Sequence, residues 1–292
     1  MKKEFKIVVL AKQVPDTRNV GKDAMTPEGT VNRAALPAIF NPEDLNALEQ
    51  ALRIKDRFPG STVTVLSMGP HRAAEIIRDA MFRGADGGVL LTDRKFAGAD
   101  TLATSYALSC AVKKIKPDMI VAGRQAIDGD TAQVGAQVAE KLGWPQITYA
   151  EEILGLEGGK MTVKRRLENG IEVVECPLPL VVTVNGSAAD CRPQNARRIM
   201  KYKYALIPTE IEACAGTLAA ELAPKYDYLQ IQEWGADAVD PEESQLGLAG
   251  SPTKVKKIEN VVFQLKESKC LSCSDDEINE LIVELLETHT LG

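Results

Sequence analysis

The sequence has little histidine and no long apolar run, and each shortage argues against a class of function. Its two histidines, His71 and His289, lie far apart in the chain of 292 residues. The chain therefore offers few histidines that could act as the base in a serine–histidine or cysteine–histidine hydrolase. No stretch of about 18 apolar residues occurs, so we expect no membrane span. The apolar run at residues 7–10 is too short for a signal peptide and lacks a small-residue cleavage site.

An excess of basic residues is also missing. The formal charge of -6 and the pI near 5.2 argue against a nucleic-acid-binding surface, which is normally basic. Two local clusters depart from this average, at residues 164–166 and 197–203. The rest of the composition, 45% hydrophobic and 26% charged, is that of a globular protein with a sizeable core.

Six cysteines in a chain of this length do not predict a disulfide framework. Four of them have apolar or small neighbours, which indicates reduced thiols in a cytoplasmic protein: Cys110, Cys176, Cys191 and Cys214. Cys270 and Cys273 have the C-x-x-C spacing of redox pairs and zinc sites. Because no second such pair or nearby histidine pair supplies further ligands, we predict no metal site. Two ordinary cysteines ahead of a capped helix are the favoured interpretation, and a redox or iron–sulfur role shared with another subunit is the alternative.

The first two-thirds of the chain alternates apolar runs with amphipathic stretches. Continuous apolar runs are expected where a parallel sheet is covered on both faces, and they predict strands at residues 7–10, 62–66, 88–91 and 119–122. Helices are predicted between them at residues 42–57, 71–82, 100–115 and 131–142. This alternation predicts an α/β fold with a Rossmann-like parallel sheet. Its ligand should bind at the carboxyl ends of the strands.

The pattern changes after residue 147. Three short strands are predicted at 147–154, 160–167 and 171–175, with Asn169 and Gly170 as a hairpin turn, and another at 180–184. We predict a nucleotide-binding domain at residues 1–190 and a carboxy-terminal arm at 191–292 that contacts partner proteins. A small subdomain with its own core is the alternative. Residues 256–265 could form a strand, and 275–288 an amphipathic helix with a Ser274–Glu277 capping box.

The most informative segment runs from Ile120 to Gly135. A buried strand leads into a glycine, then a polar loop, then a helix predicted to begin near Thr131. Backbone N–H groups at a helix N-terminus lack intrahelical partners and attract phosphate. Asp128 or Asp130 is predicted to cap the turn. The segment is neither a Walker A loop nor a G-x-G-x-x-G motif, and an ordinary capped loop is the alternative interpretation.

The same segment, Gly-Arg-Gln-Ala-Ile-Asp-Gly-Asp-Thr-Ala-Gln-Val-Gly at residues 123–135, resembles the nucleotide-binding signature of electron transfer flavoprotein beta subunits. The resemblance extends to Ala-Lys-Gln-Val-Pro-Asp-Thr at 11–17, Asn-Pro-Glu-Asp at 41–44, Met-Gly-Pro at 68–70 and Ile-Met-Lys at 199–201. It covers about two-thirds of the chain. It implies an adenine nucleotide alpha-hydrolase-like fold, a β-hairpin insertion, and pairing with an alpha subunit that carries FAD.

The resemblance also implies a nucleotide bound by this chain. The residues that would bind it are Leu10, Lys12, Asn41, Pro42, Glu43, Asp44, Met68, Gly123, Arg124, Gln125, Ala126, Ile127, Asp128, Gly129, Asp130, Thr131, Ala132, Gln133 and Val134.

Two ligands are compatible with this resemblance. Gly129 and the Val-Pro-Asp-Thr run at 14–17 are similar to the bifurcating or nitrogen-fixation-linked members, which bind a second FAD. Glycine tolerates positive φ and leaves room for a ring system, and Pro15 stiffens its loop. In this interpretation NADH delivers a hydride, and electrons pass to ferredoxin or flavodoxin and to an acyl-CoA or hydroxyacid dehydrogenase. A structural AMP in a non-bifurcating subunit is the alternative.

The segment before Ile-Met-Lys is where the family anchors its partner dehydrogenase, through a leucine. This sequence has alanine there, so docking would depend on Ala196, Arg197, Arg198, Ile199 and Met200. The cations Arg197 and Arg198 could replace the leucine, or this could be an ordinary solvated loop.

Overall fold

The computed structural model describes residues 4–16, 37–253, 271–272 and 274–287. The chain divides into two compact units, Met1–Lys256 and Lys257–Gly292. The first contains the sheet and nearly all of the described helices. In the second, the structure describes one helix and a short segment before it.

The helices and strands follow the order expected for alternating units. The α-helices are α1 (Pro42–Arg57), α2 (Ala74–Arg83), α3 (Thr101–Ile115), α4 (Val134–Leu142), α5 (Ala196–Tyr202), α6 (Pro208–Ala213), α7 (Leu218–Leu222) and α8 (Asp275–Glu287). The strands are β1 (Lys6–Leu10), β2 (Gln13–Pro15), β3 (Ala38–Phe40), β4 (Thr62–Met68), β5 (Gly87–Leu91), β6 (Met119–Gly123), β7 (Gln146–Glu157), β8 (Lys160–Leu167), β9 (Gly170–Pro177), β10 (Leu180–Val184) and β11 (Gln232–Trp234). Short 3-10 helices include η2 (His71–Ala73) and η5 (Asp227–Leu229).

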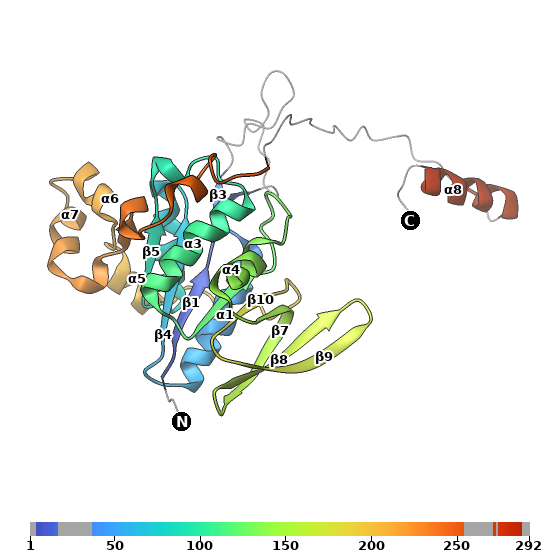
Figure 1. Ribbon diagram of the computed structural model, residues 1–292, viewed down its shortest axis with the longest axis horizontal. Helices are drawn as coiled ribbons and strands as arrows, with labels where there is room; N and C mark the ends of the chain where they lie inside the picture. Colours follow the sequence, from blue (N-terminus) through green and yellow to red (C-terminus); the bar gives the residue numbers. More distant parts are fainter. Residues whose placement is uncertain (1–3, 17–36, 254–270, 273, 288–292) are drawn as a thin grey trace, which may run out of the picture. The chain divides into compact units, whose positions relative to one another are not determined.

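Nine strands form one mostly parallel sheet in the order β11-β5-β4-β1-β6-β10-β7-β8-β9. All neighbours from β11 to β7 are parallel, whereas β7, β8 and β9 form an antiparallel meander. Figure 1 shows this meander as a yellow-green extension of the sheet. The predicted α/β class with a Rossmann-like parallel sheet is confirmed. The predicted hairpin is present, with Leu167 opposite Gly170 at its turn.

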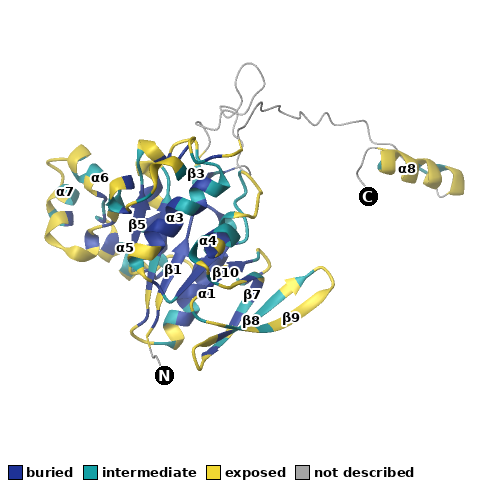
Figure 2. Ribbon diagram, viewed as in Figure 1, coloured by how far each residue is buried: buried dark blue, intermediate teal, exposed yellow. Residues whose placement is uncertain are grey.

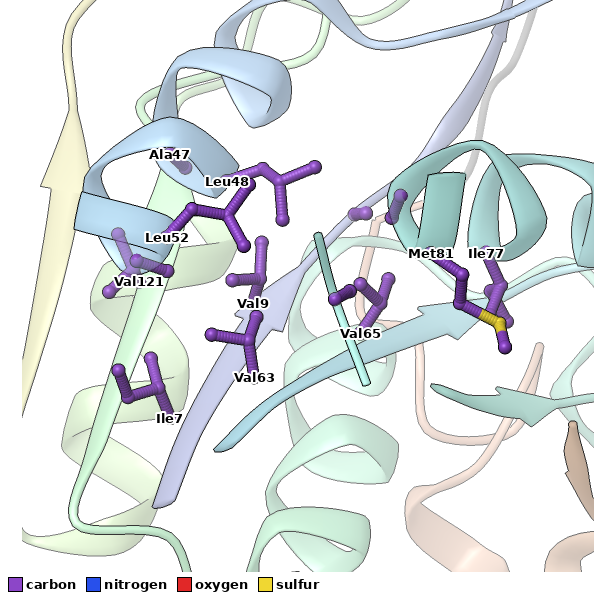
Figure 3. Packing of buried hydrophobic residues seen from close by; sticks show 14 of the residues in the cluster. Ile7, Val9, Ala47, Leu48, Leu52, Val63, Val65, Ile77, Met81 and Val121 are labelled. Carbon is purple, nitrogen blue, oxygen red and sulfur yellow. The ribbon is translucent and has the colours of Figure 1, made fainter. Parts of the chain in front are cut away.

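The central strands are buried on both faces, which explains their unbroken apolar sequence. Along β1, Ile7 and Val9 belong to the core on one face, and Val8 and Leu10 to the core on the other. Figure 3 shows Leu48 and Leu52 of α1 pointing toward β1 and β4. Figure 2 shows the same strands in dark blue and much of β9 in yellow. Burying such a side chain contributes about 1.5–3 kcal/mol.

One helix begins later than the sequence predicts. The predicted helix at 131–142 begins at Val134. Asp130 and Ala132 have φ of 49° and 52°, a left-handed conformation that a right-handed helix cannot include. The helix predicted at 71–82 starts as η2 and continues as α2.

The chain after residue 190 adds structure to the first unit. Strand β11 pairs with β5 at the edge of the sheet, with Glu233 opposite Leu90. The first compact unit therefore runs past residue 190, where we predict the arm to begin. Helix α8 is present as predicted, and the Ser274 Oγ accepts a hydrogen bond from the Glu277 N–H at 3.4 Å. The possible strand at 256–265 and the Cys270–Cys273 pair lie outside the described residues.

The four cysteines predicted to be reduced are free thiols: Cys110, Cys176, Cys191 and Cys214. Cys110 is buried and the other three are partly buried. Across the ranges that the structure describes, we find no helix that combines the length and apolarity needed to cross a membrane.

Candidate functional site

The order of the strands reverses between β1 and β6. From β1 the chain builds the sheet outward through β4 and β5, then returns to β6 on the other side of β1. In open α/β sheets, the crevice outside the carboxyl ends of strands at such a switch point is the usual ligand site. Two loops flank it here: the one after Leu10 and the one after Gly123.

Asp44, in the first turn of α1, joins these two loops. Its Oδ2 accepts a hydrogen bond from the Lys12 N–H at 2.8 Å, and its Oδ1 accepts one from the Gly123 N–H at 3.1 Å. A Cβ at Gly123 would lie 2.8 Å from the Asp44 backbone nitrogen. Glycine is therefore required where β6 ends, because α1 approaches its backbone closely.

Asn41 and Glu43 hold the residues that follow Gly123. The buried Asn41 amide donates to the Gln125 carbonyl at 2.9 Å and accepts from the Ile127 N–H at 3.2 Å. The Glu43 carboxylate accepts from the Gln125 N–H at 2.9 Å and lies 3.2 Å from the Arg124 Nη2. The Asn-Pro-Glu-Asp segment thus fixes the loop through its polar side chains, while Pro42 begins α1.

The carboxyl group of Asp44 is buried. Burial raises the pKa of Asp44 to about 7, although the N–H groups of Lys12 and Gly123 and the Asn41 side chain oppose this change. Removal of a charge from water disfavours the ionised form, whereas N–H donors favour it. Ionisation of this carboxyl group is therefore disfavoured where it joins the two loops.

The second part of the loop is exposed and sparsely bonded. Residues 129–133 are solvent-exposed, and a Cβ at Gly129 would meet no atom within 4 Å. Asp128 pairs with the Lys12 Nζ at 2.7 Å, and Asp130 accepts from the Gln125 Nε2 at 3.1 Å. The prediction that Asp128 or Asp130 caps the turn into the helix is wrong, because both carboxylates face these other partners.

Helix α4 begins without a capping side chain. Its N-cap residue, Gln133, makes no capping hydrogen bond, and its first turn has no acidic residue. Helix α3 differs, since Asp100 accepts from the Leu102 and Ala103 N–H groups. The two helix starts lie together, with the Thr101 Oγ1 donating to the Gln133 Oε1 at 2.9 Å. Among the described residues, no side chain caps the first N–H groups of α4, and the helix dipole adds a positive potential there, which together suit a phosphate group.

Leu10 and Met68 lie at the carboxyl ends of β1 and β4, the edge of the sheet where a ligand is expected to bind. Leu10 is buried, and Met68 is partly buried against the same core. Ala126 and Ile127 are partly buried in the fixed part of the loop, while Thr131 and Ala132 are exposed.

The sequence did not point to Tyr149, which lies beside the loop. The Arg124 guanidinium lies 5.5 Å from the ring centroid of Tyr149, and Tyr149 has a φ of 58°. This left-handed conformation is uncommon for a bulky residue. It occurs where the register of β7 and β10 shifts, and no local sequence signal announces such a shift. Thr101 was also missed, although the Asp-Thr pair at the start of α3 is a recognisable cap signal.

The residues predicted to dock a partner form the short helix α5. Asn195 caps it by accepting from the Arg197 and Arg198 N–H groups. Met200 is 64% exposed, and Arg198 reaches back to the Ala85 carbonyl at 3.5 Å. The segment is therefore an ordered helix with an exposed apolar residue on it.

The described part of the chain contains no group of three or more histidine, cysteine or acidic side chains arranged to hold a metal ion. A parallel sheet covered on both faces, with a switch point in its strand order beside the start of α4, defines a Rossmann-like α/β protein with a candidate anion-binding site.

Comparison with known proteins makes the assignment specific. The model of the electron transfer flavoprotein domain matches residues 28–207, more than half of the chain. The electron transfer flavoprotein subunit beta of Clostridium acetobutylicum is 45% identical over 251 residues, which cover 86% of each chain. The caffeyl-CoA reductase-Etf complex subunit CarD of Acetobacterium woodii is 50% identical over 197 residues, 67% of this chain and 74% of that one. The acryloyl-CoA reductase electron transfer subunit gamma of Anaerotignum propionicum is 38% identical over 292 residues, 98% and 100% of the two chains. The chain belongs to the electron transfer flavoprotein beta subunit family, as its sequence predicts.

Proposed function

We propose that this chain is the beta subunit of a heterodimeric, electron-bifurcating electron transfer flavoprotein and binds an FAD of its own at the switch-point crevice. The loop after β6 would hold this FAD, which would supply the redox chemistry for oxidising NADH and dividing its two electrons. One electron would go to ferredoxin or flavodoxin. The other would go through the alpha-subunit FAD to an acyl-CoA or hydroxyacid dehydrogenase.

The observation that supports a bound nucleotide most strongly is the uncapped start of α4. Gln133 provides no cap there, while Asp100 caps the neighbouring α3. An uncapped helix start beside an exposed loop has unsatisfied N–H donors, which a phosphate oxygen can accept from. The Thr131 hydroxyl and the Gln133 amide could add donors to phosphate or ribose oxygens.

The remaining residues of the site would position the ligand. Asn41, Glu43 and Asp44 fix the first half of the loop, so its backbone is in place before a ligand arrives. Lys12 pairs with Asp128 of the loop after β6 and would supply a cation near the phosphate. The Arg124 Nε is buried and has no partner among the described residues, so it could donate to a ligand acceptor.

Two features favour FAD over AMP. Among the described residues, an added Cβ at Gly129 would meet no atom within 4 Å, so this part of the loop leaves room for a ligand. Pro15 is held in a two-stranded sheet opposite Ala38, which stiffens the neighbouring loop. Among the relatives, the names of CarD and of the Anaerotignum propionicum subunit place those proteins with a caffeyl-CoA reductase and an acryloyl-CoA reductase. On the basis of this family similarity, we propose that this chain also works with a comparable partner enzyme.

Counting cofactors tests this proposal. The chain is purified with its alpha subunit, the complex is denatured in acid, and FAD and AMP in the extract are quantified by chromatography. We expect two FAD molecules for each heterodimer and no AMP. One FAD together with one AMP would overturn bifurcation and identify the chain as a structural AMP-binding subunit.

A further inference from the structure

Thr101 joins the starts of two neighbouring helices through its hydroxyl group. Helices α3 and α4 follow the parallel strands β5 and β6, so both begin toward the carboxyl edge of the sheet, and Figure 1 shows them beside each other. The Thr101 Oγ1 donates to the Gln133 Oε1 at 2.9 Å and accepts from the Gln137 Nε2 at 3.4 Å. The three side chains form a chain of hydrogen bonds that ends at Gln133, the last residue of the loop after β6.

The direction of these bonds follows from the single proton of a hydroxyl group. A threonine hydroxyl donates one hydrogen bond and accepts others. Since Thr101 gives its proton to the Gln133 Oε1, it acts as an acceptor toward Gln137. The oxygen of the Gln133 amide is thereby occupied, and among the described residues its Nε2 donates to no other group. The Gln133 side chain is exposed, so its free end offers a ligand donors only.

The same contact explains why α4 begins without a cap. Gln133 is the N-cap residue of α4 and makes no capping hydrogen bond. The Oε1 is the one strong acceptor of a glutamine side chain, and in Gln133 it is bound to Thr101. Thr101 therefore draws this acceptor away from the first turn of α4, which lacks an acidic residue as well.

The start of α3 is fixed on two sides by Asp100. Asp100 caps α3 with its carboxylate, and its Oδ2 also accepts from the Thr253 N–H at 3.1 Å. The Asp100 N–H donates to the Oγ of the buried Ser251 at 2.8 Å. The backbone that carries Thr101 is thus in place before a ligand arrives, which lowers the ordering cost of binding.

A phosphate group requires donors, because its oxygens are negatively charged and accept hydrogen bonds. An amide side chain beside a phosphate must therefore turn its nitrogen toward the ligand and its oxygen away. The bond from Thr101 holds the Gln133 oxygen in this way. If both amides were reversed, Gln133 would donate to Thr101 and turn its oxygen outward, where it would repel a phosphate.

We propose that Thr101, supported by Gln137, is a positioning residue for the nucleotide phosphate: it holds the Gln133 amide with the nitrogen facing the ligand. This inference rests on the proposed function, because it takes the start of α4 as the phosphate site. Thr101 acts on the ligand only through Gln133.

A double-mutant cycle tests this role. The heterodimer with its alpha subunit is depleted of the beta-subunit nucleotide and titrated by calorimetry with AMP, the part that FAD and AMP have in common. We expect Thr101→Val to raise the Kd of AMP about fivefold and Gln133→Ala about tenfold, as for the loss of one or two hydrogen bonds. Because Thr101 acts only through Gln133, the double variant should also lose about tenfold, whereas independent effects would multiply to about fiftyfold.

Two further variants separate the hydroxyl from the fold. Thr101→Ser keeps the hydroxyl and should bind AMP like the unmodified protein. Gln137→Met removes the partner behind Thr101 and should raise the Kd about twofold. Thr104→Val is the matched control, because it changes the next threonine on α3, which in the described structure has no hydrogen bond to Gln133 or Gln137. It should leave the Kd unchanged, and the unfolding midpoint of every variant is measured in parallel.

The inference is overturned if Thr101→Val binds AMP like the unmodified protein, or if its loss multiplies with that of Gln133→Ala. It is also overturned if Thr101→Ser loses as much affinity as Thr101→Val. A failure of the unmodified heterodimer to bind AMP would reject the nucleotide site itself, and this inference with it. Multiplied losses would reject the role of Thr101 alone, since the cofactor count independently decides between FAD and AMP.

Discussion

The two halves of the loop that follows β6 differ in almost every physical respect. Residues 123–127 are held by three side chains at the start of α1: Asn41, which precedes the helix, and Glu43 and Asp44 of its first turn. Residues 129–133 are exposed, and two of them have left-handed backbone conformations. The first half is bound by the protein itself, whereas the second half presents its backbone to solvent.

This contrast distinguishes residues that stabilise the fold from residues that contact the ligand. Removing a group that makes buried hydrogen bonds lowers the free energy of unfolding. Removing a group that contacts only the ligand lowers the affinity for the nucleotide instead. Substitutions in the first half should therefore lower the free energy of unfolding, and those in the second half should lower nucleotide occupancy alone.

The largest effect should come from Gly123→Ala. The new Cβ would lie 2.8 Å from the Asp44 backbone nitrogen and the Glu43 carbonyl carbon, so α1 or β6 would have to move. We expect a loss of about 1–3 kcal/mol in the free energy of unfolding, measured by urea denaturation. Gly129→Ala is the matched control, with no atom within 4 Å. Equal losses from both changes would remove the distinction between the two halves.

Asn41→Ala should follow. It leaves the Gln125 carbonyl and the Ile127 N–H without the buried side chain that pairs with them. We expect a loss of about 1–3 kcal/mol, with the nucleotide still bound at saturating concentration. Gln133→Ala, at the exposed end of the loop, should change stability by less than about 0.5 kcal/mol. A stable Asn41 variant with an empty site would place Asn41 among the ligand contacts instead.

The pH dependence of stability tests the joint at Asp44. Its pKa is about 7 in the folded protein against an ordinary value of 3.8. The folded state therefore retains a proton that the unfolded chain has released between these values. Because of this proton on Asp44, the free energy of unfolding falls as pH rises from about 4 through about 7, with a limiting slope of about 1.4 kcal/mol per pH unit. Urea denaturation at pH 5 to 8 should show a shallower decline for Asp44→Asn. Parallel curves for the two proteins would contradict the buried, protonated carboxyl.

The smallest effect on stability should come from Lys12→Ala. The Lys12 side chain is 50% exposed, and its pair with Asp128 is at the surface. Exposed pairs contribute about 0–1 kcal/mol, so thermal denaturation should change little. Nucleotide release should become faster, as measured by filtration after dilution. A large loss of stability without any change in release would assign Lys12 to the scaffold.

The sequence predicted the sheet well because its strands are buried on both faces. Residues such as Ile7 and Val121 leave no polar alternation that could suggest another fold. The start of α4 was placed three residues early, because the left-handed φ of Asp130 and Ala132 has no local signature in the sequence. Asn41 and Asp44 hold the loop after β6 through hydrogen bonds between segments about 80 residues apart. The periodicity of apolar residues cannot reveal such contacts. Strand β11 was missed because three residues at a sheet edge are too short to show a period.

The central claim, that residues 128–133 hold a nucleotide on a prebuilt scaffold, is tested most directly by the FAD content of variants in this segment. Thr131→Val and Asp128→Asn are each purified with the alpha subunit, and bound FAD is counted beside the unfolding midpoint. We predict that each variant keeps the alpha-subunit FAD, loses much of the second FAD, and unfolds within about 0.5 kcal/mol of the unmodified heterodimer. Full retention of both flavins, or equal loss of both, would contradict the assignment of this loop as the binding site.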